Sequence, residues 1–292
     1  MDLTRFIETG RKLRLISLRI TQHGELIAKY NWDEDDCRRN IYSASKSFTA
    51  AAVGIAQKEG LLSVDERLVD AFPDDLPETV SENLQKATVR DLLTMCLGQE
   101  TAALMGTQRP YYRETDWVKL SLSRPFVYEP GTKFVYNNVG PYLAGILVQR
   151  RAGCDLLSYL QPRMLDPLGI PRTMWEPDRL GNTMGAGGLF LNVDELHKFG
   201  LLFLQDGAWG GKQLIPASWV RACTTKQVEN GTPYGYGYLF WGGPDEVFRA
   251  DGKYCQLSLI MRKKDAVVSM LAECRDSEAL HKAIFEEIYT QL

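Results

Sequence analysis

The sequence has little of several features that would each point to a particular class of protein. Only three of its 292 residues are histidines, and its six cysteines include no C-x-x-C pair and no cysteine with a histidine at ligand spacing. A zinc site or a disulfide framework is therefore not expected. The net charge of −3 gives no reason to expect nucleic acid or an anionic membrane surface as a partner. No apolar run approaches the length of a membrane span.

The amino-acid composition is ordinary for a globular protein. The length is enough for one domain or for two interleaved ones. Residues 1–5, Met-Asp-Leu-Thr-Arg, lack the basic and apolar regions of a secretory signal. Together with the scattered cysteines, which we expect to be free thiols, this predicts a cytoplasmic protein. The oligomeric state is left open.

Strand patterns occur near both ends of the chain. Residues 15–21 alternate like a half-buried strand, His23-Gly24 supplies a turn, and residues 25–30 return as the second strand of a hairpin. An acidic run at 33–36 predicts a solvated loop. Four more strands are expected at 235–241, 246–250, 255–261 and 267–272, followed by an amphipathic helix capped at 276–278. Residues 61–205 are mostly helical in pattern.

This order predicts an α+β fold, in which residues 1–40 and 206–292 build one antiparallel sheet flanked by terminal helices. A mainly helical domain, residues 41–205, is inserted between the two parts of the sheet domain.

The segment around Ser43 carries the clearest chemical signal. After Ser43 the residues are small or apolar on every side for about three turns, and a helix with no polar face is a buried one. Ser43 is thus predicted at a helix N-terminus, where backbone N–H groups favour developing negative charge. Lys46 follows three residues later and therefore lies on the same face of the helix as Ser43. Burial would lower the pKa of the Lys46 amine and make it a proton acceptor, so the pair resembles an acyl-transfer device.

A plainer interpretation exists for these two residues. Ser43 could be an N-cap and Lys46 a surface residue, and a Ser-x-x-Lys spacing arises by chance. Against that, a lysine at the start of a fully apolar helix is costly without polar partners, so we expect such partners elsewhere in the chain.

The order of several motifs resembles the serine β-lactamase/penicillin-binding-protein superfamily, and most of all its class C branch of β-lactamases, D-Ala-D-Ala carboxypeptidases, esterases and amidases. Residues 42–49, Tyr-Ser-Ala-Ser-Lys-Ser-Phe-Thr, are similar to the family's nucleophile motif, and 134–140, Phe-Val-Tyr-Asn-Asn-Val-Gly, to its Tyr-x-Asn motif. Residues 89–98, 166–170 and 187–189 follow the family's order. The resemblance covers nearly the whole chain and implies a β-lactamase/transpeptidase-like fold.

The resemblance also implies roles for individual residues. Ser43 would be the nucleophile, Lys46 and Tyr136 would move its proton, and Asn138 would hold the lysine and the substrate. Which of Lys46 and Tyr136 is the base stays open. No metal or organic cofactor is implied.

The third family motif, usually Lys-Thr-Gly or His-x-Gly, corresponds to the stretch 250–253, which reads Ala-Asp-Gly-Lys here. By the resemblance, Ala250 and Gly252 would line the substrate site, and the backbone N–H groups of Ser43 and Lys253 would form the oxyanion hole. The usual cation is missing at Ala250, which favours an esterase or amidase over an efficient β-lactamase. Trp241-Gly242-Gly243 is a rival position for this motif.

Two other functions compete with this prediction. A Ser-His-Asp triad would need one of the three histidines, but no Gly-x-Ser-x-Gly elbow accompanies them. An acyl-binding or sensing protein of the same fold with little turnover is the second alternative. The substrate, expected to be a small ester, amide or peptide, is not identified, because the site walls come from variable loops at 97–117 and 229–234.

Overall fold

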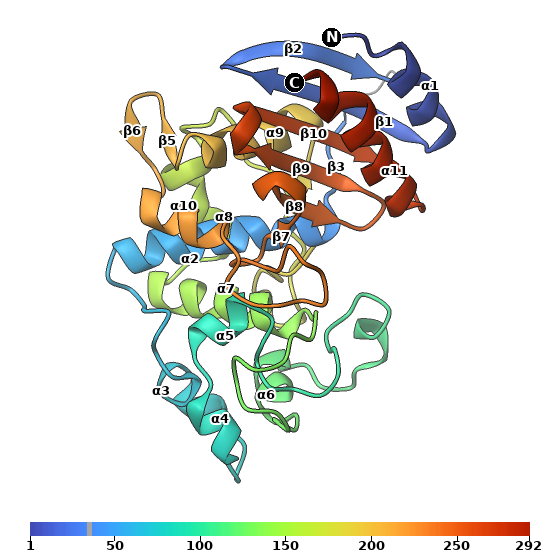
Figure 1. Cartoon of the computed structure of the whole chain (residues 1–292). Coiled ribbons are helices and arrows are strands. Elements are labelled where there is room, and N and C mark those ends of the chain that lie inside the picture. Colours follow the sequence, from blue (N-terminus) through green and yellow to red (C-terminus); the bar gives the residue numbers. More distant parts are fainter. Residues whose placement is uncertain (34–36) are drawn as a thin grey trace.

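A computed structural model describes residues 1–33 and 37–292 of the chain. The acidic loop expected at 33–36 therefore lies, apart from Asp33, outside the described residues. An antiparallel sheet forms the upper part of the molecule in Figure 1, with strand order β2-β1-β10-β9-β8-β7. Its strands are β1 (Leu15–Gln22), β2 (Glu25–Asn31), β7 (Trp241–Gly242), β8 (Phe248–Gly252), β9 (Gln256–Met261) and β10 (Ala266–Ala272).

The two ends of the chain meet in this sheet. β1 pairs with β10 from Leu15 opposite Ala272 to Gln22 opposite Ala266. The termini lie near one another in Figure 1, and the backbone N–H of Asp2 donates to Gln291 Oε1 at 2.8 Å. The mixed fold with an antiparallel sheet that the sequence predicts is therefore confirmed, as is the β1–β2 hairpin.

Helices cover both faces of the sheet and fill the rest of the molecule (Figure 1). α1 and α11 lie on one face over their own apolar layer, and α9 packs on β9 and β10 from the other side. The helices are α1 (Thr4–Lys12), α2 (Ser45–Lys58), α3 (Leu68–Ala71), α4 (Glu82–Lys86), α5 (Val89–Leu93), α6 (Trp117–Leu122), α7 (Val139–Ala152), α8 (Leu156–Leu160), α9 (Val193–Leu204), α10 (Ala217–Cys223) and α11 (Ser277–Ala283). Short strands pair outside the main sheet: β3 (Arg39–Asn40) with β4 (Phe190–Leu191), and β5 (Ala208–Trp209) with β6 (Lys212–Gln213).

The strands of the main sheet all fall within residues 1–40 and 206–292, while α2 to α8 fall within 41–205. α9 belongs by sequence to the second range but packs on the sheet. The exact division into two domains stays a prediction.

Two expectations about strands were wrong. β1 is buried along both faces rather than half-buried, because its polar face is covered by α9, where the fully buried Arg19 bonds Asp194 at 2.6 Å. The segment 235–241 is a strand only from Trp241. Gly235 and Leu239 adopt positive φ angles of 69° and 58°, and the backbone N–H of Gly237 donates to Phe240 O at 2.9 Å, which closes a turn.

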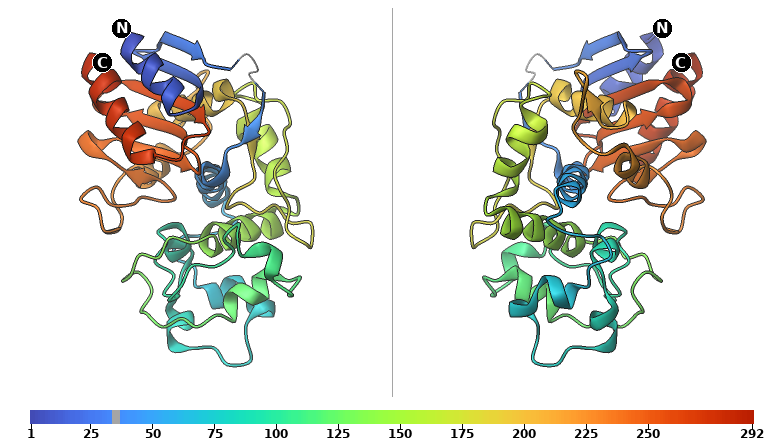
Figure 2. Two further views of the ribbon diagram at one scale, coloured as in Figure 1. Left: turned by 90° about the vertical axis from the view of Figure 1, so that its right-hand side faces the viewer. Right: turned by 90° about the vertical axis from the view of Figure 1, so that its left-hand side faces the viewer.

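Helix α2 runs through the middle of the molecule, between the sheet and the lower helices (Figure 2). Every residue from Ser45 to Ala56 is buried, as its lack of a polar face predicts. Gly54 leaves room for the Trp219 ring, since a Cβ there would lie 2.2 Å from Trp219 Cδ1. The helix ends at Lys58, just before Gly60 turns the chain with a φ of 74°.

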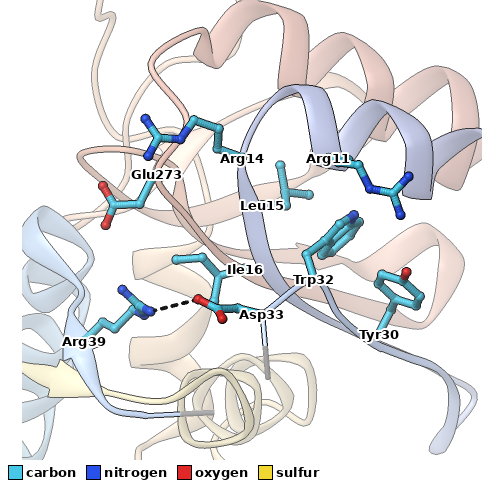
Figure 3. A pocket seen from close by; sticks show the side chains of 9 residues that line it. All are labelled: Arg11, Arg14, Leu15, Ile16, Tyr30, Trp32, Asp33, Arg39 and Glu273. Carbon is cyan, nitrogen blue, oxygen red and sulfur yellow. Dashed lines mark hydrogen bonds and ion pairs between the residues drawn. The ribbon is translucent and has the colours of Figure 1, made fainter. Parts of the chain in front are cut away.

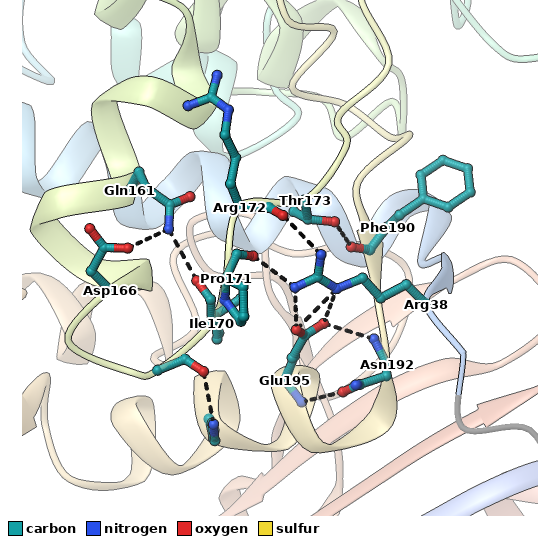
Figure 4. A network of polar contacts seen from close by, with 12 residues as sticks. Arg38, Gln161, Asp166, Ile170, Pro171, Arg172, Thr173, Phe190, Asn192 and Glu195 are labelled. Carbon is teal, nitrogen blue, oxygen red and sulfur yellow. Dashed lines mark hydrogen bonds and ion pairs between the residues drawn. The ribbon is translucent and has the colours of Figure 1, made fainter.

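A polar network anchors the segment that leads into α2 (Figure 4). The Arg38 guanidinium donates to both carboxylate oxygens of Glu195 in α9, at 2.5 and 2.9 Å, and to the carbonyl oxygens of Pro171 and Arg172. Glu195 in turn completes the capping box at the start of α9 with Asn192. These bonds fix the residue directly before β3, a few residues before Ser43.

None of the helices in the described part of the chain has the combined length and apolar character needed to cross a bilayer.

Candidate active site

Ser43 lies in a tight turn directly before α2. Residues Tyr42–Ala44 form one 3₁₀ turn, and Tyr42 has a φ of 47°, an uncommon conformation for a bulky residue. Side-chain bonds hold the turn: Asn40 Oδ1 accepts from the Tyr42 N–H at 2.8 Å, and Ser45 Oγ donates to Tyr42 O at 2.6 Å. The prediction that Ser43 sits at the start of the buried helix is correct to within this extra turn.

Lys46 points from the first turn of α2 toward Ser43, and its Nζ lies 3.0 Å from Ser43 Oγ. The side chain is 1% exposed, and Nζ also donates to Asn138 Oδ1 at 2.6 Å and to Ala186 O at 2.7 Å. A neutral amine has two N–H donors and one lone pair. Donation to Asn138 and Ala186 therefore leaves the lone pair for the Ser43 hydroxyl.

The surroundings of Lys46 favour that neutral form. Burial, and to a smaller extent the positive charge of Arg109, together lower the pKa of the Lys46 amine from 10.5 to about 7. Both bonded oxygens belong to neutral groups, an amide and a carbonyl, so neither offers the full countercharge that would restore the ammonium.

Tyr136 lies beside both Ser43 and Lys46. Its hydroxyl is hydrogen-bonded to Ser43, and Lys46 Nζ lies 5.0 Å from the centre of its ring. Trp241 packs against the same ring at a centroid distance of 5.1 Å. Burial raises the pKa of the Tyr136 phenol, the bond with Ser43 opposes that shift, and the negative charge of Asp251 adds to it. The phenol therefore keeps its proton at neutral pH.

Asn138 precedes α7, but its side chain does not cap that helix. Asn137 does so instead, accepting from the Gly140 N–H at 2.8 Å. Asn138 Nδ2 donates to Leu104 O at 2.9 Å, which turns Oδ1 toward Lys46. The buried lysine thus has the polar partners that the sequence required, and one of them is the predicted asparagine.

The third motif forms the opposite wall, but with a different face from the one expected. In β8 the side chains alternate, and Arg249 and Asp251 face the cleft while Ala250, 1% exposed, packs into the hydrophobic core. The structure therefore does not bring Ala250 into the site. Arg249 Nε donates to Asp251 Oδ2 at 2.8 Å and Nη1 to Gly242 O at 3.1 Å.

Gly252 and Lys253 do reach the site. A Cβ on Gly252 would lie 2.1 Å from Ile41 O, so only glycine allows the end of β8 to meet the turn that carries Ser43. Lys253 follows at the rim, exposed, with its Nζ 4.8 Å from the centre of the Tyr254 ring.

These residues line one open cleft of about 930 Å³. The cleft contains Ser43, Tyr136 and Asn138 together with the third-motif residues 251–253. Loop residues 105–107 and 109 form part of its wall, as expected, whereas 229–234 are not among its lining residues within the described chain. Trp241, the rival motif position, lines it too. Sequence reasoning missed Arg109 and Glu176 as cleft residues, because isolated charges in irregular loops follow no period.

The three histidines contact groups other than Ser43 in the described structure, and His281 Nε2 comes within 4.0 Å of Oδ2 of the cleft residue Asp251. His197 is buried between Thr21 and Ser269, His23 contacts Asp265, and His281 bonds the Ser277 carbonyl oxygen. Among the described residues none of them lines the cleft with Ser43.

A second cavity of about 450 Å³ lies where α1, β1 and β2 meet the residue after β10 (Figure 3). It contains none of the predicted site residues. Its lining is Arg11, Arg14, Leu15, Ile16, Tyr30, Trp32, Asp33, Arg39 and Glu273.

Comparison with known proteins gives a family match along nearly the whole chain and curated relatives along about half of it. A sequence model of the family described as Beta-lactamase matches residues 3–289. Monacolin J acid methylbutanoyltransferase from Aspergillus terreus is 29% identical over 153 residues, which cover 46% of this chain and 36% of that protein. N-acetylmuramyl-L-alanine amidase from Bacillus subtilis is 26% identical over 178 residues, which cover 52% of this chain and 40% of that protein. The chain thus spans less than half the length of both relatives.

Solved structures are similar over nearly the full chain. A penicillin-binding protein from Bacillus halodurans superposes with a TM-score of 0.77 at 17% identity, covering 97% of this chain and 99% of its own. A class C beta-lactamase in complex with cefoxitin superposes with a TM-score of 0.77 at 15% identity. The match covers 100% of this chain and 97% of that chain. At these identities the likeness shows the fold, which is β-lactamase/transpeptidase-like.

Proposed function

Because the chain belongs to the beta-lactamase family, we propose that it is a serine hydrolase that acts through an acyl-enzyme on an ester, amide or β-lactam carbonyl. The observation that carries this proposal is the 3.0 Å contact between Ser43 Oγ and the buried amine of Lys46. An amine with a pKa of about 7 is available as a base at neutral pH.

In the first step Ser43 Oγ attacks the substrate carbonyl carbon and its proton passes to Lys46 Nζ. Tyr136, bonded to Ser43, gives its phenol proton to the leaving group and takes a proton from the Lys46 ammonium in exchange, so that the alcohol or amine departs neutral and both side chains regain their starting protonation. We assign the base to Lys46 rather than Tyr136, because burial raises the pKa of the phenol and lowers that of the amine.

The negative charge on the carbonyl oxygen would be held by the backbone N–H groups of Ser43 and Lys253. The close approach that Gly252 allows between β8 and the Ser43 turn supports this pair of donors. One such donor is typically worth about 3 kcal/mol of transition-state stabilisation. Water then attacks the acyl-enzyme, the neutral Lys46 amine accepts its proton, and the same proton passes to Ser43 Oγ as the bond to the acyl group breaks and the acid is released.

An esterase or amidase activity is favoured over efficient β-lactam hydrolysis. The family's usual third-motif cation is absent at position 250, and the neighbouring Arg249 is engaged by Asp251 and by the Gly242 carbonyl oxygen. A β-lactam carboxylate would therefore have to compete with Asp251 for that guanidinium.

The test is labelling of the protein with a fluorophosphonate serine probe, followed by intact-mass measurement. We expect one adduct on the wild type, none on Ser43→Ala, and an unchanged adduct on the matched control Ser47→Ala, whose hydroxyl bonds Leu239 O inside the core. Absence of an adduct on folded wild type would overturn the serine-hydrolase proposal. An adduct without hydrolysis of any 4-nitrophenyl ester would favour the acyl-sensing alternative.

A further inference from the structure

Arg109 stands on the wall of the cleft opposite β8. It begins the short turn Arg109–Tyr111, and its side chain is 26% exposed and lines the same cleft as Ser43. The loop that carries it is tied to the catalytic residues, because Asn138 bonds both Lys46 and the Leu104 carbonyl oxygen a few residues before Arg109. Arg109 is therefore held at a defined place relative to Ser43.

The guanidinium has no hydrogen-bond partner among the described residues. Its Nε is buried without a hydrogen bond, and Glu176 forms a loose ion pair with it, because Oε2 lies 3.8 Å from Nη1, beyond hydrogen-bond distance. Glu176 Oε1 accepts instead from Asn40 Nδ2 at 3.2 Å. An arginine N–H group that is withdrawn from water and has no acceptor is unfavourable in free energy. A ligand that accepts a hydrogen bond from it would therefore gain binding energy.

The other cations of the cleft differ in this respect. Arg249 is bonded to Asp251, while Lys253 lies exposed over the Tyr254 ring and Arg275 is exposed at the rim. Within the described residues, Arg109 alone combines partial burial, unused donors and a place in the cleft wall. A planar fork with free donors suits a carboxylate, which it can bind through two parallel hydrogen bonds.

We propose that Arg109 binds a carboxylate carried by the substrate, so that the enzyme prefers acyl compounds with an anionic group directed toward the loop at 104–109. This inference rests on the proposed hydrolase function. It places the anion-binding group on the loop at 104–109 rather than on β8, the strand that carries the family's third motif.

Binding of an anion at Arg109 has an electrostatic consequence for the base. The positive charge of Arg109 contributes to the lowered pKa of Lys46. A bound carboxylate offsets that charge, so the pKa of Lys46 should be higher in the complex with an anionic substrate than with a neutral one. The acid limb of kcat should then lie at higher pH for the anionic substrate.

The experiment compares two esters, mono(4-nitrophenyl) glutarate and 4-nitrophenyl pentanoate, which differ in a terminal carboxylate or methyl group. We expect wild type to favour the glutarate in kcat/KM and Arg109→Gln to lose roughly 10- to 100-fold of that preference, the worth of a charge-assisted hydrogen bond. Arg109→Lys should retain part of it. The matched control Arg113→Gln removes an equal charge from the same loop outside the cleft lining and should keep the wild-type ratio.

An unchanged ratio in Arg109→Gln, or no preference in wild type, would overturn the proposal. If the wild type hydrolyses the neutral ester and its Ser43 reacts with the fluorophosphonate probe, such a result contradicts Arg109 alone and leaves the hydrolase function standing. Calorimetric binding of monomethyl glutarate to Ser43→Ala, with and without Arg109→Gln, decides the matter without turnover. We expect the double variant to bind at least about 10-fold more weakly, and equal affinities would refute the role of Arg109.

Discussion

At the scale of single residues, the chemistry of this site rests on opposite effects of burial on two groups. Burial destabilises whichever form carries charge, so it lowers the pKa of the Lys46 amine and raises that of the Tyr136 phenol. The result is a lysine amine that is partly neutral near pH 7 and a tyrosine phenol that keeps its proton, both beside Ser43. Asn138 and the Ala186 carbonyl oxygen orient the amine without giving it a negative partner.

The first prediction concerns the pH dependence of ester hydrolysis. Because the proposed mechanism requires a neutral Lys46 to accept the Ser43 proton, kcat/KM should rise with pH through the Lys46 pKa of about 7 and fall on the acid side. A pH–rate profile with a neutral ester measures this limb, and Arg109→Gln should move it to higher pH. A limb near the ordinary lysine value of 10.5 would contradict the assignment.

A second prediction separates the Tyr136 hydroxyl from its ring. Tyr136→Phe keeps the packing against Trp241 but removes the bond to Ser43, so kcat should fall by roughly 10²- to 10⁴-fold, the usual worth of a positioned acid–base group. Steady-state kinetics measures the loss. Tyr234→Phe, an exposed tyrosine outside the cleft lining, is the control and should behave like wild type. Wild-type turnover in Tyr136→Phe would exclude the proton relay.

At the scale of elements, the site is the place where three of them meet. Ser43 lies just before α2 and Lys46 lies in its first turn. Asn138 comes from the start of α7, and the end of β8 closes the cleft from the sheet side. The contact between β8 and the Ser43 turn is a backbone contact, and Gly252 makes it possible. The geometry of the proposed active site therefore depends on a packing distance between elements as well as on side chains.

Gly252→Ala tests that dependence. The added Cβ would meet Ile41 O at 2.1 Å and must push β8 away from the turn, displacing a proposed oxyanion donor. We expect activity to fall roughly 10²- to 10³-fold and stability to fall by about 1–3 kcal/mol. Kinetics and urea unfolding measure the two effects. The control is Gly145→Ala in α7, where the nearest atom to a new Cβ is 3.5 Å away. Full activity in Gly252→Ala would show that this contact is dispensable.

At the scale of the whole molecule, the sheet separates two apolar layers, and a buried polar seam joins it to α9. His197 of α9 lies in that seam, with Nε2 2.7 Å from Thr21 Oγ1 in β1 and Nδ1 3.0 Å from Ser269 Oγ in β10. Burial lowers the pKa of His197 to about 4, with Asp194 opposing and Arg19 reinforcing the shift. The seam therefore holds a neutral histidine.

This predicts acid-sensitive stability. Unfolded His197 titrates near 6.5 and folded His197 near 4, so the unfolded state binds the proton more readily between these values. The contribution of neutral His197 to the free energy of unfolding is up to roughly 3 kcal/mol. It is fully present above about pH 6.5 and is lost as the pH falls to about 4. Urea unfolding across this range should show a shallower pH slope for His197→Asn than for wild type. His23→Gln, an exposed control, should keep the wild-type slope, and equal slopes in all three proteins would refute the prediction.

The sequence by itself determined what local spacing controls. The i,i+3 relation puts Lys46 beside Ser43, the absence of a polar face buries α2, and alternation with a His-Gly turn produces the β1–β2 hairpin. The resemblance to a known family added the fold and directed attention to Tyr136 and Asn138. These features survive because helix and hairpin geometry is set by residues close together in the chain.

Only the tertiary structure decided which faces meet. Alternation along β8 separates Ala250 from Arg249 and Asp251 but does not say which set lines the cleft, and the packing against α2 resolves it. The cover of α9 on β1 makes a strand that alternates in sequence fully buried. Arg109 lies in an irregular loop with no period to mark it, so its place opposite β8 depends on contacts between segments distant in sequence, which local pattern does not encode.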